Sequence, residues 1–497
     1  MTDAYSRLEA RFARLSALEG AGAVLHWDFA TMMPEGGAAT RGLQMAELQV
    51  IAHEILTAPE TGALIHEASE ADGLDPWQAA NLAEMQRHFL QATAVPADLV
   101  AAESKASSAC EMVWREARER ADFALILPSL AEMVRIGREV AQAKGEALGL
   151  DPYAALMAGY EPGLTPALVD ALFAPLIAEL PGLLDAVLER QARLGPPIRP
   201  AGMFPIPQQQ ALARRLMTRL GFDFRHGRLD ESHHPFCGGV AEDIRITTRY
   251  DTVDPTSALM AVLHETGHAL YEAGRPLAWR GQPVGEARGM LVHESQSLLV
   301  EMQACRSSAF LAYLGPVLAE AFGRVEPAFA PGNLTRLYTH VERGFIRVDA
   351  DEVTYPLHVI LRYRLEQDLI AGRLAVADLP EAWSAQMREL LGITPPDDAK
   401  GCLQDVHWPA GAFGYFPCYT LGAMTAAQLF QAARAALPAL DGDLAAGEFT
   451  ALLGWLRANV HELGSSRLGL DIVEAATGRP LGADAFLGHL NARYLAD

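Results

Sequence analysis

The stretch "DPTSALMAVLHETGHALYEAG", residues 254–274, has the ends and the periodicity of a single helix. Asp254 is a suitable N-cap, a proline follows at the first helical position, and Gly274 stands just past the expected end of the helix. Side chains four residues apart lie on one face of a helix, so His264 and His268 can direct two imidazole nitrogens at one ion. The alternative is an amphipathic helix that carries two partly buried histidines.

The residues between the two histidines favour the metal. His264-Glu265-Thr266-Gly267-His268 is the H-E-x-x-H arrangement of zinc peptidases. Glu265 lies about 100° around the helix from His264, where it can reach a water on the ion without binding the ion itself. Gly267 costs roughly 0.5–1 kcal/mol relative to alanine inside a helix. We therefore expect another segment to approach the helix closely at this glycine.

A third ligand is expected from a second helix, because a catalytic zinc usually takes three protein ligands and keeps one position for water. The segment "LVHESQSLLVEMQ" offers Glu294, which is flanked by apolar residues. Glu286, in the turn before this helix, and Glu301, two turns further along it, compete for the same role. We favour Glu294 and expect the neighbouring His293 to lie outside the ligand set.

A second aromatic and ionisable cluster can supply hydrogen-bond donors. "QDVHWPAGAFGYFPCY", residues 404–419, carries His407, Tyr415 and Tyr419 on a glycine-rich stretch. Amide hydrolysis at a metal needs donors for the oxyanion that develops on the substrate carbonyl. These side chains are candidates for that role, and the alternative for each is a structural aromatic residue.

Arginines are the candidates for recognising the substrate. Arg347, in "GFIRVDADEVTYP", could hold the terminal carboxylate of a peptide with two parallel hydrogen bonds. The alternative is a salt bridge from Arg347 to Asp349 or Asp351. Arg245, on a predicted strand, is a weaker candidate for contact with the substrate.

The rest of the chain predicts a mainly helical protein with a small sheet. The best strand pattern is residues 242–250, directly before the histidine helix. A single helix is expected over residues 290–322. The stretch "LTPALVDALF" begins another helix, with Thr165 as N-cap, and the prolines that follow within it, Pro175 and Pro181, predict a kink or a break.

Composition excludes several partners and compartments. The 497 residues include 40 Lys and Arg and 62 Asp and Glu, a net charge of −22 that repels nucleic acid and anionic lipid. No run of about 18 apolar residues is free of charges or helix breakers, and the N-terminus lacks a signal-peptide pattern. We therefore expect a cytoplasmic protein without a membrane span. Five scattered cysteines indicate no disulfide framework.

Several motifs in order along the chain resemble the carboxypeptidase Taq family of metallocarboxypeptidases. "HETGH" and "HESQ" match the two zinc motifs of that family, and four further motifs accompany them. These are "HPF" at 234–236, "DIRIT" at 243–247, "IRVDAD" at 346–351 and "GCLQDVHW" at 401–408. The sequence departs from the family after "HESQS", where Leu298, Val300 and Met302 replace polar or aromatic residues.

The resemblance implies a large helical metallopeptidase fold with a deep groove, similar to angiotensin-converting enzyme and neurolysin, and often a homodimer. It implies one domain over residues 1–497, with two lobes and with substrate loops at 345–351 and 401–419. It also implies a zinc ion, replaceable by cobalt or manganese, and release of single C-terminal amino acids with broad preference.

Individual roles are carried over by position. His264, His268 and Glu294 are the implied ligands and Glu265 the general base. Arg347 would bind the terminal carboxylate, His407 and Tyr415 would donate hydrogen bonds, and Tyr419, Arg245 and His234 would contact the substrate or line its rim. The alternatives are a zinc oligoendopeptidase that cuts within short peptides and a non-catalytic, metal-stabilised scaffold that binds peptides.

Overall fold

The structure is a computed structural model that describes residues 3–233 and 235–495. It is mainly α-helical with one small sheet, which confirms the predicted fold class. The chain forms two compact units. Unit 1 comprises Met1–Ala92, Pro197–Tyr338 and Thr425–Pro480, and unit 2 comprises Thr93–Pro196, Thr339–Met424 and Leu481–Asp497. The single domain predicted over residues 1–497 stays a prediction.

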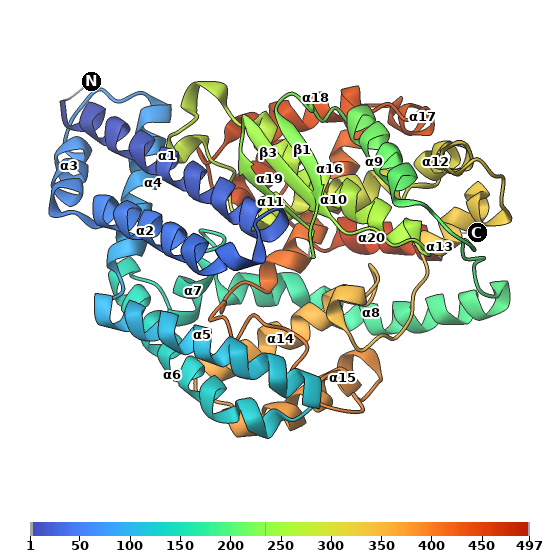
Figure 1. Ribbon diagram of the computed structural model, residues 1–497, viewed down its shortest axis with the longest axis horizontal. Helices are drawn as coiled ribbons and strands as arrows, with labels where there is room; N and C mark the ends of the chain where they lie inside the picture. The colour runs from blue at the N-terminus through green and yellow to red at the C-terminus, as the bar shows by residue number, and fades with distance from the viewer. Residues whose placement is uncertain (1–2, 234, 496–497) are drawn as a thin grey trace. The chain divides into compact units, whose positions relative to one another are not determined.

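Helices make up most of both units (Figure 1). The helices of unit 1 are α1 (Asp3–Thr31), α2 (Ala38–Thr57), α3 (Pro59–Ser69), α4 (Pro76–Thr93), α9 (Ile206–Leu220), α10 (Pro255–Gly274), α11 (Met290–Leu298), α12 (Ser308–Phe322), α13 (Pro331–Tyr338), α17 (Leu440–Ala445), α18 (Thr450–Asn459) and α19 (Gly469–Thr477). The helices of unit 2 are α5 (Ala97–Arg120), α6 (Phe123–Leu148), α7 (Pro152–Met157), α8 (Pro166–Leu194), α14 (Tyr355–Ile370), α15 (Leu379–Leu391) and α20 (Asp484–Tyr494). Helix α16 (Pro417–Ala436) begins in the residues of unit 2 and ends in those of unit 1.

The sheet of unit 1 lies against the histidine helix α10 (Figure 1). Its strands are β1 (Gly227–Glu231), β2 (Phe236–Val240) and β3 (Asp243–Thr248), in the order β1-β3-β2. Strand β3 pairs parallel with β1 and antiparallel with β2. Ile244 and Ile246 of β3 are buried in one cluster with Val262 and Ala269 of α10. The predicted strand over 242–250 is confirmed, and its alternating pattern is what fixes the face that meets α10.

Helix α10 forms as its sequence predicts. The Asp254 side chain accepts a hydrogen bond from the backbone amide of Thr256 at 2.9 Å, which caps the first turn. Pro255 is the first helical residue and Gly274 is the last, rather than the residue just beyond the end. The helix buries Leu263 and Tyr271 among its apolar residues and leaves the two histidines partly accessible.

The single helix predicted over 290–322 is wrong. The segment divides into α11, a π-helical turn over Leu299–Cys305, and α12. Ser307 separates the last two, since its hydroxyl accepts a hydrogen bond from the backbone amide of Phe310 at 3.1 Å and so begins a new helix. The apolar periodicity runs on through this boundary, which is why the sequence alone predicts one helix.

Helix α8 begins as predicted and continues further than predicted. The Thr165 hydroxyl accepts from the amide of Leu168 at 3.3 Å. The helix then runs on through Pro175 and Pro181, so the predicted break is absent. Apolar side chains on both sides of the two prolines are buried. Their packing offsets the backbone hydrogen bond that each proline removes.

Within the described residues, α8 is long and apolar enough to cross a membrane by length and composition alone. The core helix of a folded domain passes the same test, and 39% of this apolar stretch is buried. Asp170, near its start, accepts a hydrogen bond from the hydroxyl of Tyr363 on α14 at 2.9 Å. Eight apolar side chains along α8 are buried, and we interpret α8 as a packing helix of unit 2.

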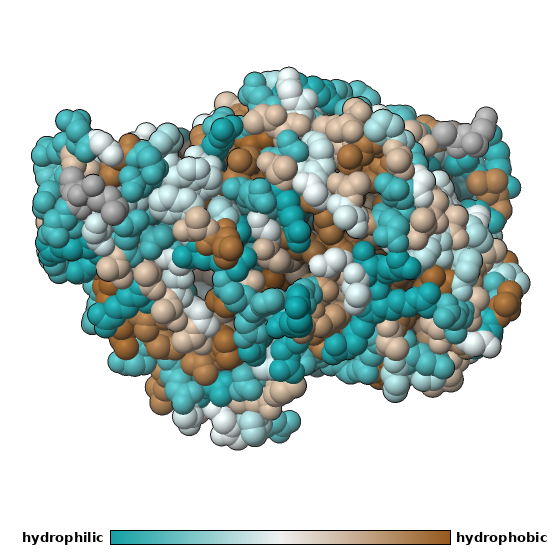
Figure 2. Space-filling model, turned by 90° about the horizontal axis from the view of Figure 1, so that it is seen from above, coloured by the Kyte–Doolittle hydropathy of each residue, from teal (hydrophilic) through white to brown (hydrophobic). Residues whose placement is uncertain are grey.

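The surface agrees with the charged composition. Figure 2 shows hydrophilic residues spread over one face, with apolar residues gathered in smaller patches between them. The five cysteines are all free, and four of them are buried.

Candidate metal centre

Three side chains of unit 1 form a cluster with the spacing of metal ligands. The imidazole rings of His264 and His268 lie with their centroids 5.0 Å apart. Oε2 of Glu294 is 3.4 Å from Nε2 of His268 and 3.9 Å from Nε2 of His264. One ligand atom from each residue falls within 4.8 Å of the other two. Two imidazole nitrogens and one carboxylate oxygen make a donor set that a divalent transition-metal ion such as zinc accepts.

Gly267 allows the two helices to meet. A Cβ atom at this position would lie 2.6 Å from the carbonyl oxygen of Gln296 and 2.6 Å from the Cα of Ser297. Both are backbone atoms of α11, so they cannot move away as a flexible side chain would. The close approach predicted from this glycine is present, and it brings Glu294 to the histidines.

Glu301 contacts one of the candidate ligands without belonging to their cluster. Its Oε2 atom is 2.9 Å from Nδ1 of His264, the ring nitrogen that does not face Glu294. Its Oε1 atom accepts a hydrogen bond from Nη2 of Arg306 at 2.5 Å. Glu301 is thus placed behind His264 and is not an alternative third ligand in this structure.

His293 lies behind the second histidine. Nδ1 of His293 is 2.7 Å from Nδ1 of His268, and its Nε2 is 2.9 Å from Oε1 of Glu272. Arg275 pairs with the other oxygen of Glu272 at 3.0 Å. If His268 binds an ion through Nε2, the proton of the His268 ring is on Nδ1. Nδ1 of His293 then accepts a hydrogen bond from that N–H, and Nε2 of His293 donates to Glu272.

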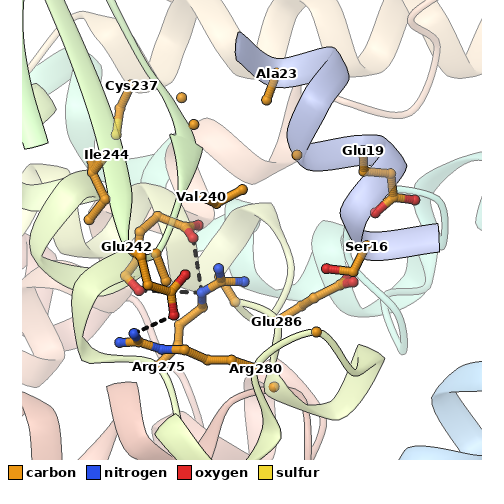
Figure 3. A pocket seen from close by; sticks show the side chains of 18 of the residues that line it. Ser16, Glu19, Ala23, Cys237, Val240, Glu242, Ile244, Arg275, Arg280 and Glu286 are labelled. Atoms are coloured by element: carbon orange, nitrogen blue, oxygen red, sulfur yellow. Dashed lines mark hydrogen bonds and ion pairs between the residues drawn. The ribbon is translucent and has the colours of Figure 1, made fainter. Parts of the chain in front are cut away.

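Glu286 lines a neighbouring cavity of about 410 Å³ in unit 1, together with Glu272 and His293 (Figure 3). Arg280 pairs there with Glu242. Burial raises the pKa of Glu286 to about 8. The cluster of possible metal ligands does not include this residue, so it is not an alternative to Glu294.

The electrostatics of the cluster favour a cation. Burial lowers the pKa of His264, but the hydrogen bond to Glu301 and the charges of Glu294 and Glu301 outweigh it and raise that pKa to about 9. Although burial opposes ionisation of Glu294, the hydrogen bond to His268 holds its pKa at about 2. Burial raises the pKa of Glu265 to about 7. Carboxylates thus surround the imidazoles, and a divalent cation would balance their charge.

The predicted substrate residues of unit 2 form a separate network. Nε and Nη2 of Arg347 donate to Oδ1 of Asp405 at 3.0 and 2.7 Å, and Nη1 donates to the Tyr355 hydroxyl at 2.7 Å. The salt bridge considered for Arg347 therefore exists, with Asp405 as the partner in place of Asp349 or Asp351. The other oxygen of Asp405 accepts from Nε of Arg362 at 2.6 Å.

The aromatic cluster predicted around His407 comes together. Nε2 of His407 is 3.3 Å from the Tyr419 hydroxyl, and the Tyr415 and Tyr419 rings meet edge to face with centroids 5.0 Å apart. Burial lowers the pKa of His407 to about 4, so the ring is neutral near pH 7. A neutral imidazole has one N–H group to donate.

Glu366 of α14 was not found from the sequence. Its carboxylate is fully buried and accepts from the Tyr153 hydroxyl at 2.7 Å, from Nε1 of Trp408 at 2.7 Å and from the amide of Gly414 at 2.5 Å. Trp408 directly follows His407 and Gly414 directly precedes Tyr415, so both contacts fall on the loop that carries these two side chains. The only signal in the sequence is a glutamate in a helix that also carries two arginines and an aspartate, a pattern that usually indicates a solvated position.

Comparison with known proteins decides the family. A family model described as carboxypeptidase Taq (M32) metallopeptidase matches residues 7–494. The chain belongs to this family. Thermostable carboxypeptidase 1 of Thermus thermophilus is 39% identical, with 96% of each chain covered. Trypanosoma cruzi metallocarboxypeptidase 1 has a similar structure, with a TM-score of 0.98, 41% identity and 100% of each chain covered. The M32 carboxypeptidase of Deinococcus radiodurans R1 has a TM-score of 0.95, 37% identity and 99% coverage of each chain.

Two motif residues of this M32 chain, Arg245 and His234, were predicted to contact the substrate or line its rim. Arg245 pairs with Asp243 at 2.6 Å and packs over the ring of Trp27, 4.4 Å from its centroid, so its guanidinium is engaged within unit 1. Its predicted contact with substrate stays a prediction. His234, the first residue of "HPF", lies outside the described residues.

The departures from the usual family sequence lie beside Glu294 and Glu301. Leu298 is the last residue of α11, and Val300 and Met302 belong to the π-helical turn. The three substitutions leave the ligand cluster intact.

We expect Gly267→Ala to weaken metal binding and to lower the urea midpoint of unfolding. The new methyl group forces the backbone of α11 away from α10, and overpacking of this kind typically costs about 1–3 kcal/mol. Gly182→Ala in α8 is the matched control, because a Cβ there meets no atom within 4 Å. Equal zinc affinity in both variants and the wild type would contradict the role of Gly267.

We expect Glu366→Gln to change how stability depends on pH. Burial raises the pKa of Glu366 to about 7 from an ordinary value of 4.5. Because the folded pKa is the higher, the protonated carboxyl stabilises the fold fully below 4.5, and this contribution is lost as the pH rises through 7. When the pH rises from about 5 to about 8, the urea concentration at the unfolding midpoint should fall further for the wild type than for Glu366→Gln. Glu389→Gln, at an exposed carboxylate of α15, serves as control and should follow the wild type.

Proposed function

We propose that this M32 protein is a zinc carboxypeptidase that releases single amino acids from the C-terminal end of peptides, with cobalt or manganese as possible substitutes. The observation that carries the proposal is the cluster of His264, His268 and Glu294 with Glu265 beside it, in a chain that belongs to a carboxypeptidase family. The finer expectations of a cytoplasmic location, a homodimer and broad residue preference are part of the same proposal.

The three residues would hold the ion through Nε2 of each histidine and one oxygen of Glu294. When bound there, zinc polarises the scissile carbonyl and stabilises negative charge on its oxygen. Gly267 and the backbone of α11 keep the ligand side chains together. Partners behind each histidine hold its Nδ1, which leaves Nε2 available to the ion.

Glu265 is the proposed general base. It takes a proton from the attacking water and later gives it to the leaving amine. A purely structural metal site has no use for such a residue, which argues against a non-catalytic scaffold.

Arg347 is the proposed partner of the terminal carboxylate. A guanidinium has five N–H donors, and Asp405 and Tyr355 accept three of them, so two are left for a substrate. His407 and Tyr415 are the proposed donors to the substrate carbonyl, and Tyr419 and Arg245 are proposed to contact the substrate elsewhere. A substrate with a free C-terminal carboxylate is what this set would select, in preference to cleavage within a chain.

We expect Glu265→Gln to lower hydrolysis roughly 10²-fold or more while zinc content stays at one ion per chain. The amide keeps the shape of the side chain but cannot accept the proton. Metal analysis and peptide hydrolysis are measured on the same preparation, with the exposed Glu320→Gln as control. Loss of zinc in step with activity would show that Glu265 helps to hold the ion.

We expect an N-blocked peptide to lose its last residue when its C-terminus is free and to stay intact when it is amidated. Product analysis with and without a chelator measures this. Arg347→Lys keeps a positive charge for Asp405 but has three N–H groups in place of five and no planar fork, so it should raise KM for the free acid. The control Arg364→Lys, on the partly exposed face of α14, should leave KM unchanged. Cleavage of the amide at the same rate would favour the oligoendopeptidase instead.

A further inference from the structure

Glu301 is the carboxylate next to the metal centre that has no role in the chemistry above. It lies on the side of the His264 ring opposite to Glu294, with Oε2 2.9 Å from Nδ1. Nε2 of the same ring is the nitrogen nearest Glu294. Because Nδ1 faces a carboxylate, which can only accept, the ring proton stays on Nδ1 when Nε2 binds an ion.

Arg306 holds Glu301 in place. Glu301 is 7% exposed, and a buried carboxylate needs a partner charge. Nη2 of Arg306 donates to Oε1 of Glu301 at 2.5 Å, and Nη1 donates to the carbonyl oxygen of Tyr338 at 3.2 Å. The guanidinium is thus tied to the backbone at the end of α13, and through it Glu301 is tied as well.

Glu301 lies in the π-helical turn Leu299–Cys305, which directly follows α11. In a regular α-helix the seven residues from Glu294 to Glu301 rise roughly 10.5 Å along the axis. The two carboxylates here flank one imidazole ring. A π-helical turn closes its hydrogen bonds from i to i+5, so it fits more residues into each turn and shortens that rise. Such turns are rare and are often found at functional sites.

We propose that Glu301 is a positioning residue of the metal centre, which orients His264 and fixes the tautomer that exposes Nε2, and that Arg306 and the π-helical turn exist to hold it there. The inference rests on the metal site of the proposed function. A partner of this kind behind a histidine ligand typically changes metal affinity 10–100-fold.

Glu301→Gln tests the inference, with Glu84→Gln as the matched control. Glu84 is also a buried carboxylate of unit 1, paired with the buried Arg288 at 2.6 Å and with Arg87 at 2.7 Å. Both variants lose a buried ion pair, so both should unfold at lower urea in the metal-free form. The zinc dissociation constant, measured by competition with a chelator, should rise about 10–100-fold in Glu301→Gln and stay within twofold in Glu84→Gln.

Arg306→Lys gives a second measurement that does not depend on how Glu301→Gln folds. Lysine keeps the positive charge opposite Glu301 but has a single nitrogen donor in place of the planar guanidinium. The zinc affinity of Arg306→Lys should therefore lie between that of the wild type and that of Glu301→Gln. Wild-type affinity in Glu301→Gln or in Arg306→Lys overturns the inference, and so does an equal loss in Glu84→Gln. A wild type that binds no divalent metal overturns the proposed function itself, and the positioning role with it.

Discussion

The backbone contact between α10 and α11 at Gly267 is the constraint on which the candidate site of this M32 protein depends. The absence of a side chain lets the carbonyl of Gln296 and the Cα of Ser297 lie against the histidine helix. That spacing places Glu294 opposite His264 and His268. A helix interior tolerates the cost of a glycine when close packing of this kind offsets it.

In each unit, buried carboxylates paired with guanidinium groups hold the segments that carry the proposed functional side chains. In unit 1 the pair of Glu301 and Arg306 stands behind His264. In unit 2 Asp405 joins Arg347 to Arg362, and the loop that begins with it carries His407. Removal of one partner from such a pair leaves an uncompensated buried charge, which is strongly destabilising. These pairs therefore restrict the positions that the functional side chains can take.

Local spacing predicted the elements whose signals lie within a few residues. The N-cap and the two histidines gave α10 to within one residue at its end, and alternation in "DIRIT" gave β3 and its buried face. The cluster of His407, Tyr415 and Tyr419 was also expected from their closeness in the chain. Continuity of helices was less predictable. The π-helical turn after α11 and the passage of α8 through two prolines both depend on packing that apolar periodicity does not describe.

By itself, the sequence determined the histidine helix, the glycine within it and the family motifs, because each is a matter of residue type and short spacing, and it offered Glu294 as the candidate third ligand. Only the tertiary structure decided which partner each charge takes. Glu301 was a possible ligand until the π-helical turn placed it on Nδ1 of His264. Asp405 and Glu366 became anchors of the loop through contacts 42 to 58 residues away in the chain. A carboxylate looks the same in a sequence whether it faces solvent, an arginine or a histidine, and the desolvation that separates these cases arises only when the chain folds.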